Sequence, residues 1–256
     1  MSPDASTSID ADLAWLRQQL RDLGLGDGDT VMAHASLRAI GPVSGGAATL
    51  VQALLDVLGA AGTLAGYVDY EKTTEIPYFD PARSPASSGY GVLAELIRTW
   101  PGAVRSNNPG ASMAAMGARA AWLCADHPMD YGYGAGSPLA KLVQVQGKVV
   151  LLGSDLDQVT LLHYAEDRAI LARKRIIHVT ETILVDAELR DVAIEEFDTS
   201  HPIVDEMPPT YFDQIVSQFL ATGRARSGRV GRALCYLLPA PDLVEFAIEK
   251  MEREFG

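Results

Sequence analysis

The segment Lys148-Val-Val-Leu-Leu-Gly-Ser-Asp-Leu-Asp-Gln-Val-Thr-Leu-Leu-His-Tyr-Ala-Glu166 decides the fold and also indicates where the chemistry lies. Its first five residues form an apolar run typical of a parallel strand that is buried on both faces. The remainder predicts a helix that follows directly, with Asp157 as its N-cap. Because open α/β sheets bind ligands at the carboxyl ends of their strands, we expect a binding site after Leu152.

Three polar side chains, Thr160, His163 and Glu166, follow this strand at intervals of three residues. That spacing places them on one helical face, with Thr160 in the first turns, where free N–H groups favour negative charge. The set suits proton transfer, with His163 as the base and Glu166 as the group that orients it. On spacing alone, a surface ion pair is the more frequent outcome of such a histidine and glutamate.

Helix and strand patterns alternate along the rest of the chain. Upstream, apolar strands are expected at Thr30–Ala33 and Gly62–Val68, each preceded by a helix with leucines on one face. Downstream, alternating residues around the turn Asp186–Arg190 predict an antiparallel hairpin added to the sheet. We therefore expect one α/β domain over residues 1–256, with a mixed, largely parallel central sheet, flanking helices and this added hairpin.

The composition restricts the partners. The chain has 21 Lys and Arg against 33 Asp and Glu, and its formal charge of −12 disfavours nucleic acid and anionic membranes and suits a polycationic ligand. Acidity that serves only solubility is the alternative. With no basic leader and no apolar run of roughly 18 residues, a cytoplasmic location is expected. Cys124 and Cys235 lie in apolar runs, which predicts reduced core residues, and the scattered histidines predict no metal site.

Two further groups of residues are candidates for ligand contact. The segment His34-Ala-Ser-Leu-Arg38, followed by a loop rich in small residues up to Gly46, suits a phosphate cradle, although an ordinary strand-to-helix loop explains the pattern as well. The segment Arg105–Ser112 suits an anion contact or simple turn chemistry. Acidic candidates for a cationic ligand, for which plain solvation is the alternative, are Asp69, Glu71, Asp198, Asp205 and Glu206.

In their order along the chain, these segments resemble the aminoglycoside 3-N-acetyltransferases, an antibiotic acetyltransferase family with a non-GNAT fold. The resemblance rests on His34-Ala-Ser-Leu-Arg-Ala-Ile-Gly-Pro-Val-Ser-Gly-Gly46, Phe79-Asp-Pro-Ala82, Arg98-Thr-Trp-Pro101, Arg105-Ser-Asn-Asn-Pro109, Tyr131-Gly-Tyr-Gly134, Gly136-Ser-Pro-Leu139 and Thr160-Leu-Leu-His-Tyr-Ala-Glu166. It implies acetyl-CoA as the donor, and as acceptor the 3-amino group of a 2-deoxystreptamine antibiotic. The expected reaction needs neither a metal nor a membrane, and the chain is expected to act as a monomer or a homodimer.

The resemblance also implies residue roles. His163 corresponds to the catalytic histidine, Glu166 to its carboxylate and Thr160 to a hydroxyl near the thioester carbonyl. The residues that match the coenzyme A site are His34, Ser36, Leu37, Arg38, Val43, Ser44, Gly45, Gly46, Ser106 and Ser112. The residues expected to contact the antibiotic are Asp69, Tyr70, Glu71, Asp198, Asp205 and Glu206.

Two other functions remain open at this stage. The chain could acylate a different small amine with the same chemistry, or it could bind coenzyme A without catalysis. Because no residue is a convincing covalent acyl acceptor, we expect direct transfer in a ternary complex, with His163 as general base.

Overall fold

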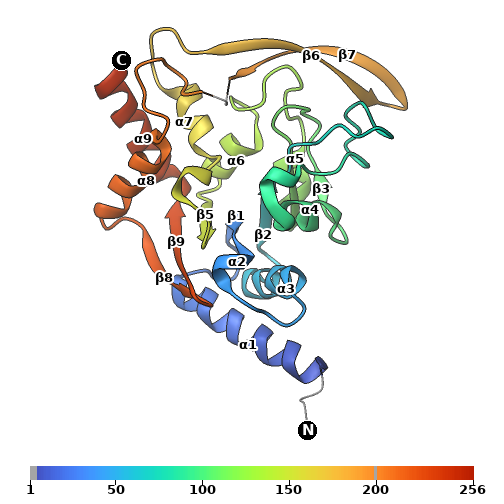
Figure 1. Ribbon diagram of the computed structural model, residues 1–256, viewed down its shortest axis with the longest axis vertical. Coiled ribbons are helices and arrows are strands. Elements are labelled where there is room, and N and C mark those ends of the chain that lie inside the picture. Colours follow the sequence, from blue (N-terminus) through green and yellow to red (C-terminus); the bar gives the residue numbers. More distant parts are fainter. Residues whose placement is uncertain (1–4, 199–200) are drawn as a thin grey trace.

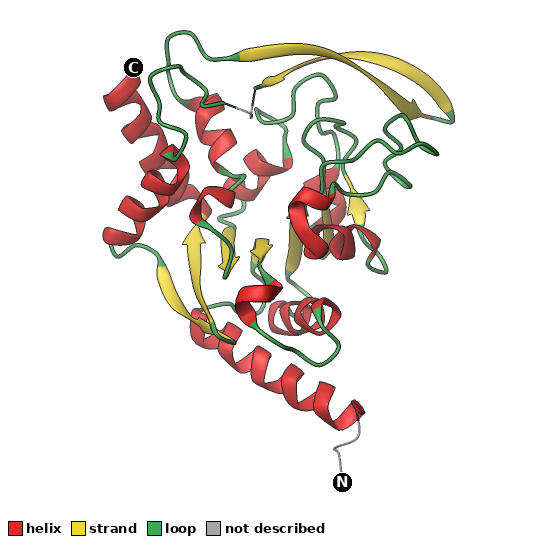
Figure 2. Cartoon of the chain, in the orientation of Figure 1, coloured by secondary structure: helices red, strands yellow, loops and turns green. Residues whose placement is uncertain are grey.

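A computed structural model of the chain describes residues 5–198 and 201–256 (Figure 1). Helices cover a central sheet, and a long hairpin crosses the top of the view (Figure 2). The helices are α1 (Ala5–Leu23), α2 (Leu37–Ile40), α3 (Ala47–Leu58), α4 (Gly91–Thr99), α5 (Ala120–Cys124), α6 (Pro138–Gln144), α7 (Leu162–Arg168), α8 (Tyr211–Ala221) and α9 (Ala240–Phe255), with short 3₁₀ turns η1 (Ser88–Tyr90) and η2 (Leu156–Gln158). The strands are β1 (Thr30–Ala35), β2 (Thr63–Tyr67), β3 (Val104–Arg105), β4 (Met113–Gly117), β5 (Lys148–Leu152), β6 (Ile176–Val185), β7 (Glu188–Phe197), β8 (Arg226–Val230) and β9 (Ala233–Pro239).

The central sheet has the strand order β3-β4-β2-β1-β5-β9-β8. Its middle is parallel, because β1 pairs in parallel with both β2 and β5, whereas the flanking pairs are antiparallel. The mixed α/β class is therefore confirmed, although parallel pairing is confined to three strands. A buried antiparallel strand such as β9 has the same apolar pattern as a parallel one, so the sequence did not distinguish strand direction.

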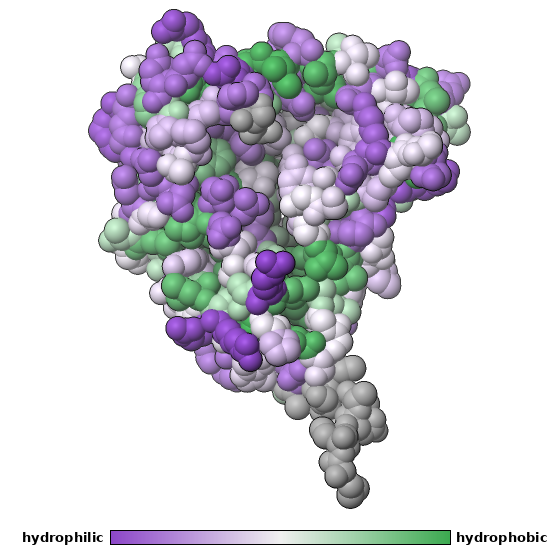
Figure 3. Space-filling model, viewed as in Figure 1, coloured by the Kyte–Doolittle hydropathy of each residue, from purple (hydrophilic) through white to green (hydrophobic). Residues whose placement is uncertain are grey.

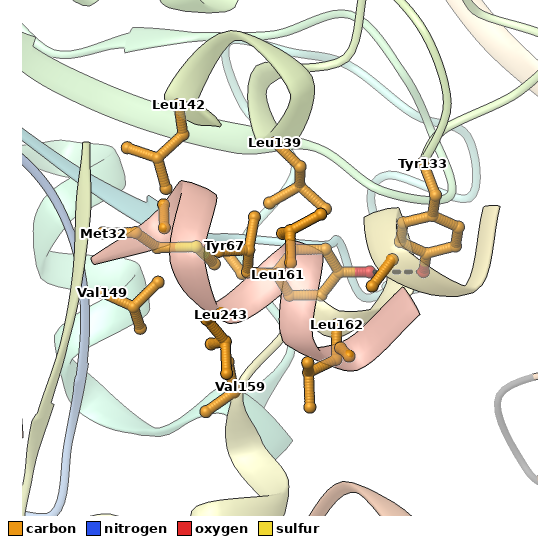
Figure 4. Packing of buried hydrophobic residues seen from close by; sticks show 14 of the residues in the cluster. Met32, Tyr67, Tyr133, Leu139, Leu142, Val149, Val159, Leu161, Leu162 and Leu243 are labelled. Carbon is orange, nitrogen blue, oxygen red and sulfur yellow. Dashed lines mark hydrogen bonds between the residues drawn. The ribbon is translucent and has the colours of Figure 1, made fainter. Parts of the chain in front are cut away.

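Strand β5 explains why the segment quoted first is so apolar. Val149 and Leu151 point into a core shared with α5 to α9, and Val150 and Leu152 point into a second core shared with α1, α3 and α4. All four side chains are fully buried. Figure 4 shows the first of these cores, where Val149 and Leu243 lie among leucines of neighbouring helices. Burial on both faces fixes β5 at the centre of the sheet.

The predicted hairpin is confirmed, but it forms a separate two-stranded sheet and is not added to the central one. Asp186 and Ala187, with φ of 50° and 66°, make a tight turn, so the strand resumes at Glu188 and includes part of the predicted turn. The hairpin is anchored through Phe79, whose N–H donates to Thr182 and whose carbonyl accepts from Leu184. Its position is therefore set by a distant loop, which strand periodicity does not encode.

The segment after β5 also differs from the prediction. The 3₁₀ turn η2 occupies Leu156–Gln158, Val159 is non-helical with φ −77° and ψ 84°, and α7 begins only at Leu162 without a side-chain cap. Asp157 is therefore not an N-cap, and Thr160 lies in the turn before the helix. The carbonyl of Thr160 accepts the His163 N–H at 3.0 Å, which ties this turn to the start of α7.

Both cysteines are buried and free, as predicted. Burial raises the pKa of the Cys124 thiol to about 12, so it carries little thiolate at neutral pH. Among the described residues, no helix is both long and apolar enough to cross a membrane. Within the same part of the chain, no group of three metal-ligating side chains is suitably placed.

Candidate active site

His163 and Glu166 form a hydrogen-bonded pair on α7. His163 Nδ1 lies 2.7 Å from Glu166 Oε2, and the side chains are 20% and 6% exposed respectively. The Glu166 carboxylate is thus buried beside the His163 imidazole. This arrangement favours the tautomer with Nδ1 protonated and leaves Nε2 available to accept a proton.

Aromatic side chains surround the imidazole of His163. The Tyr133 ring lies at 4.9 Å, the Phe212 ring at 5.1 Å and the Phe197 ring at 6.5 Å, and Phe197 is also stacked on Tyr133. Tyr133 is itself fixed, because its hydroxyl lies 3.1 Å from that of Tyr67 (Figure 4). Rigid neighbours of this kind hold a catalytic ring in one orientation.

His163 lies where two cavities meet. We call the first the strand-end cavity; it measures about 300 Å³ and is lined by residues that include His34, Tyr67, Ser154, Thr160 and His163. The second, the α8 cavity, measures about 230 Å³ and is lined by residues that include His163, Glu166, Asp198, His201 and Tyr211. Asp157 and Phe212 border both, so a group bound in one cavity can meet a group bound in the other at the imidazole.

The strand-end cavity contains two buried polar atoms that lack a partner among the described residues, His34 Nε2 and Ser154 Oγ. His34 is the penultimate residue of β1, and Ser154 follows β5, its parallel neighbour in the sheet. Burial lowers the pKa of His34 to about 4, so this ring is neutral at pH 7. Because leaving such atoms unpaired is costly, the cavity suits a ligand with hydrogen-bonding groups of its own.

The loop that follows β1 combines a helix cap with a glycine turn. Ser36 Oγ accepts the Ala39 N–H and caps α2, which carries Leu37 and Arg38. Residues Val43 to Gly46 then lead into α3, and the Ser44 N–H donates to Asp12 Oδ2 at 2.7 Å. The loop therefore already binds one carboxylate oxygen through its backbone.

The structure does not bring Ser106 and Ser112 to either cavity. Both are fully buried, and their hydroxyls bond within the protein: Ser106 to the Met113 N–H and Ser112 to the Val68 carbonyl. The guanidinium of Arg105 is likewise directed inward, donating to the carbonyls of Ser84 and Val68 at 2.5 Å. The segment Arg105–Ser112 thus directs these polar groups into hydrogen bonds within the protein.

A third cavity, the hairpin cavity, measures about 430 Å³ and collects acidic side chains beneath β6 and β7. Its lining includes Asp69, Tyr70 and Glu71, three of the residues expected to contact the antibiotic, together with Glu181 and Glu196 of the hairpin. Burial, with the charge of nearby Glu196, raises the pKa of Asp69 to about 8. Burial also raises the pKa of Glu196. A cationic ligand bound beside these carboxyl groups would favour their ionised forms and so lower their pKa values.

The other predicted acidic residues are separated from this cavity. Asp198 lines the α8 cavity beside His201, at 3.3 Å from its Nδ1. Asp205 and Glu206 are exposed and pair with Arg175 and Arg173, and they line none of the three cavities. The predicted acidic set is therefore divided between two cavities and the surface.

Several site residues were missed from the sequence. Tyr67 ends a strand that was predicted, two residues before Asp69, so its place at the same strand end could have been inferred. Tyr133 lies in a glycine-rich loop that carried no strand or helix signal. Glu181 and Glu196 depend on where the hairpin docks, which is determined by tertiary contacts such as those of Phe79 and the hydrogen bond from the Glu195 N–H to the Asp130 carbonyl.

Comparison with known proteins gives a consistent result. The sequence profile of the family described as aminoglycoside 3-N-acetyltransferase matches residues 32–252. Aminoglycoside N(3)-acetyltransferase III of Pseudomonas aeruginosa is 40% identical over 95% of this chain and 94% of its own. Aminoglycoside N(3)-acetyltransferase IX of Micromonospora chalcea is 40% identical over 93% of this chain and 92% of its own.

Solved structures are equally similar. A structure described as AAC-IIIb in a binary complex with CoASH is 43% identical, with a TM-score of 0.92 over 95% of this chain and 97% of that one. A structure of sisomicin-bound AAC-VIa is 37% identical, with a TM-score of 0.89 over 95% and 98% of the two chains. The resemblance inferred from sequence motifs is thereby confirmed, and the chain belongs to the aminoglycoside 3-N-acetyltransferase family of acyltransferases.

Proposed function

We propose that this protein transfers the acetyl group of acetyl-CoA to the 3-amino group of 2-deoxystreptamine aminoglycosides, and so confers resistance to them. The observation that carries the proposal is the His163–Glu166 pair at the junction of two cavities, with Thr160 on the wall of one of them. A two-substrate transfer needs such a junction, because donor and acceptor must meet beside one base. The ligands named for the two solved relatives, CoASH and sisomicin, are a donor product and an acceptor of this kind.

His163 serves as the general base. An ammonium group cannot attack a thioester, and an aliphatic amine with a pKa of about 8 is mostly protonated at pH 7. His163 Nε2 accepts the proton that the amine loses, while Glu166 fixes the ring and stabilises the imidazolium. The Thr160 hydroxyl supports the negative charge that develops on the carbonyl oxygen.

The donor occupies the strand-end cavity and the loop beside it. The unpartnered His34 Nε2 and Ser154 Oγ fit the amide-rich pantetheine arm, because an amide both donates and accepts hydrogen bonds. The residues Ser36 to Arg38 and Val43 to Gly46 follow His34 and Ala35, which line this cavity, and hold the pyrophosphate.

The acceptor binds at the two cavities that carry acidic side chains, the α8 cavity and the hairpin cavity. Asp198 in the α8 cavity attracts one amine of the antibiotic, and Asp69, Tyr70 and Glu71 in the hairpin cavity contact others. Transfer is direct, within a ternary complex, since both cysteines are buried and neither lines the three cavities.

The test is thiol release from acetyl-CoA with gentamicin, kanamycin, neomycin and apramycin, followed by NMR of the product. We expect turnover with at least one of them and acetylation at the 3-amino group. Coenzyme A binding without turnover on this panel would contradict the proposed acceptor, and turnover with another small amine would then identify a different N-acyltransferase. Coenzyme A binding with no turnover on any amine would instead indicate a catalytically silent binding protein.

A further inference from the structure

The hairpin cavity already holds one positive charge, which belongs to the protein itself. Lys72 lines this cavity, and its Nζ lies 3.0 Å from Glu181 Oε1 and 2.8 Å from Glu181 Oε2. The hydroxyl of Tyr70 donates to the same carboxylate. Among the described residues that line the cavity, Lys72 alone has a cationic side chain. Glu181 therefore already receives a primary ammonium, the kind of group that an aminoglycoside presents.

The Lys72–Glu181 ion pair is not what docks the hairpin. Phe79 forms two backbone hydrogen bonds with β6, and the Glu195 N–H of β7 donates to the Asp130 carbonyl at 2.8 Å. None of these bonds involves Lys72, whose side chain is 52% exposed. Because an ion pair that is this exposed contributes little to stability, removal of the lysine is expected to leave the hairpin in place.

The other acidic side chains of the cavity are less available to a cation. Burial raises the pKa of Asp69 to about 8, so most of this side chain is protonated at pH 7. Burial, with the charge of nearby Glu181, raises the pKa of Glu196. The Glu71 Oε2 atom accepts the Ser88 N–H at 3.1 Å. An ammonium group that enters the cavity at neutral pH therefore competes with Lys72 for Glu181.

The Lys72 side chain can leave Glu181 without disturbing the fold. Its ammonium is a strongly hydrated charge on a flexible four-carbon stem, and more than half of the side chain is already exposed. Figure 3 shows strongly hydrophilic residues over the hairpin and the loops beneath it, at the upper right of the view. A displaced ammonium would therefore remain in a polar, solvated region.

We propose that Lys72 is a specificity-determining residue of the acceptor site: its ammonium takes the place of one antibiotic amine on Glu181, and an acceptor that brings an amine to this carboxylate has to displace it. Lys72 thus weakens the binding of such acceptors relative to those whose amines lie elsewhere. This inference rests on the proposed function, since it assumes that the hairpin cavity receives the antibiotic. If Lys72 instead supported the site by holding Glu181 in position, its removal would weaken binding.

The experiment measures the binding of gentamicin, kanamycin, neomycin and apramycin to the full chain by calorimetry at low salt. Coenzyme A is present, and it has no acetyl group to transfer. The variants are Lys72→Met, Lys72→Arg and the double variant Lys72→Met/Glu181→Gln. The matched control is Arg190→Met, because Arg190 is also 52% exposed and pairs with Glu188 on the same hairpin without lining the cavity. Thermal unfolding of each variant checks that the fold is retained.

We expect Lys72→Met to bind at least one of the four antibiotics roughly 2- to 5-fold more tightly than wild type, as suits the loss of an exposed competing ion pair. The gain should differ among the four antibiotics, so that their order of affinity changes. Lys72→Arg, which keeps the charge, should retain the wild-type order, and the added Glu181→Gln should abolish the gain. Arg190→Met should change all four affinities by one small factor, which measures the effect of net charge.

Two outcomes would overturn the role of Lys72 alone. Weaker binding by Lys72→Met would favour the supporting role, and gains no larger than those of Arg190→Met would reduce the effect to net charge. A different outcome would overturn the proposed function and this inference with it: coenzyme A binds, but neither wild type nor Lys72→Met binds any of the four antibiotics.

Discussion

The surroundings of His163 and the hairpin cavity are built in opposite ways. His163 and Glu166 lie three residues apart on one short helix, in contact through a single 2.7 Å hydrogen bond and enclosed by aromatic rings. The hairpin cavity gathers Asp69 from the end of β2 and Glu181 and Glu196 from the two hairpin strands. The first region has one hydrogen-bonded pair of fixed geometry, whereas the second has several acids that repel one another.

This difference indicates that the two regions contribute to different kinetic constants. A base must be held in one orientation relative to the reacting amine, so its contribution is expected in kcat. A polycation is held by the summed field of several carboxylates, so their contribution is expected in KM. Substitutions around His163 should therefore change kcat, and substitutions in the hairpin cavity should change KM.

The largest effect is expected from His163→Ala. Loss of a general base should lower kcat by roughly 10²- to 10⁴-fold, with little change in CoA affinity. Steady-state kinetics at saturating antibiotic measure kcat, and calorimetry measures CoA binding. His178→Ala, which removes an exposed histidine of β6, is the matched control. A variant with near wild-type turnover would remove His163 from the mechanism.

Glu166→Gln should have the next largest effect. The amide keeps the shape of the buried side chain but cannot stabilise the imidazolium, so kcat should fall by roughly 10- to 10³-fold while KM changes little. The same assay measures both constants, and Glu249→Gln on the exposed face of α9 is the control. If KM rose and kcat held, Glu166 would belong with the binding acids, and the comparison between the two regions would fail.

The two regions also differ in how far the sequence could predict them. The spacing Thr160, His163, Glu166 placed the histidine and its carboxylate together, because a helix converts a spacing of three into contact. The error lay at the start of the helix: a non-helical Val159 separates η2 from α7, and backbone dihedrals of single loop residues leave little trace in the sequence.

Only some of the residues that line the hairpin cavity could be predicted from the sequence. Asp69 and Tyr70 follow a recognisable strand, so their place at its end could be inferred. Glu181 lies between two threonines and Glu196 follows another glutamate, on a hairpin whose two faces are both largely accessible, and that pattern gives no docking position. Ser106 and Ser112 show the converse: their motif is polar, yet tertiary packing encloses both hydroxyls.

A smaller effect, confined to KM, is expected from Asp69→Asn. Because burial raises the pKa of Asp69 to about 8, the wild-type side chain is mostly neutral at pH 6 and mostly ionised at pH 8.5. The variant should therefore match the KM of wild type for antibiotic at pH 6 and exceed it by roughly 3- to 10-fold at pH 8.5, at low salt. Glu75→Gln, an exposed acid of the same loop, is the control. A KM ratio that does not change with pH would place Asp69 outside the antibiotic site.

The same substitution predicts a change in stability. The folded protein binds the Asp69 proton more tightly than the unfolded chain, in which aspartate titrates near a pKa of about 3.9. The contribution of Asp69 to stability is therefore fully present below pH ~4 and is lost as pH rises to ~8. Relative to wild type, Asp69→Asn should thus gain melting temperature as pH rises through this window. An opposite slope would mean that Asp69 is ionised in the folded protein.

The smallest effect is expected where the two regions touch. Tyr133 and Tyr67 line both the strand-end and the hairpin cavities, and their hydroxyls are hydrogen bonded. Tyr133→Phe removes this bond but keeps the ring against His163, and the Tyr67 hydroxyl can still donate to the Gly110 carbonyl at 3.2 Å. It should cost about 1 kcal/mol of unfolding free energy and change kcat by less than about 3-fold.

Tyr164→Phe, on the same helix as His163, is the matched control for stability. Chemical denaturation measures the free energy of unfolding, and steady-state kinetics measure kcat and KM for each variant. If Tyr133→Phe lowered kcat 10-fold or more, the hydrogen bond between the two tyrosine hydroxyls would be needed to position His163. The surroundings of His163 and the hairpin cavity would then be coupled and could not be treated as separate. If only the free energy of unfolding changed, the Tyr133 ring alone would be sufficient to position His163. Substitutions could then change binding of the polycation without changing proton transfer, and the reverse.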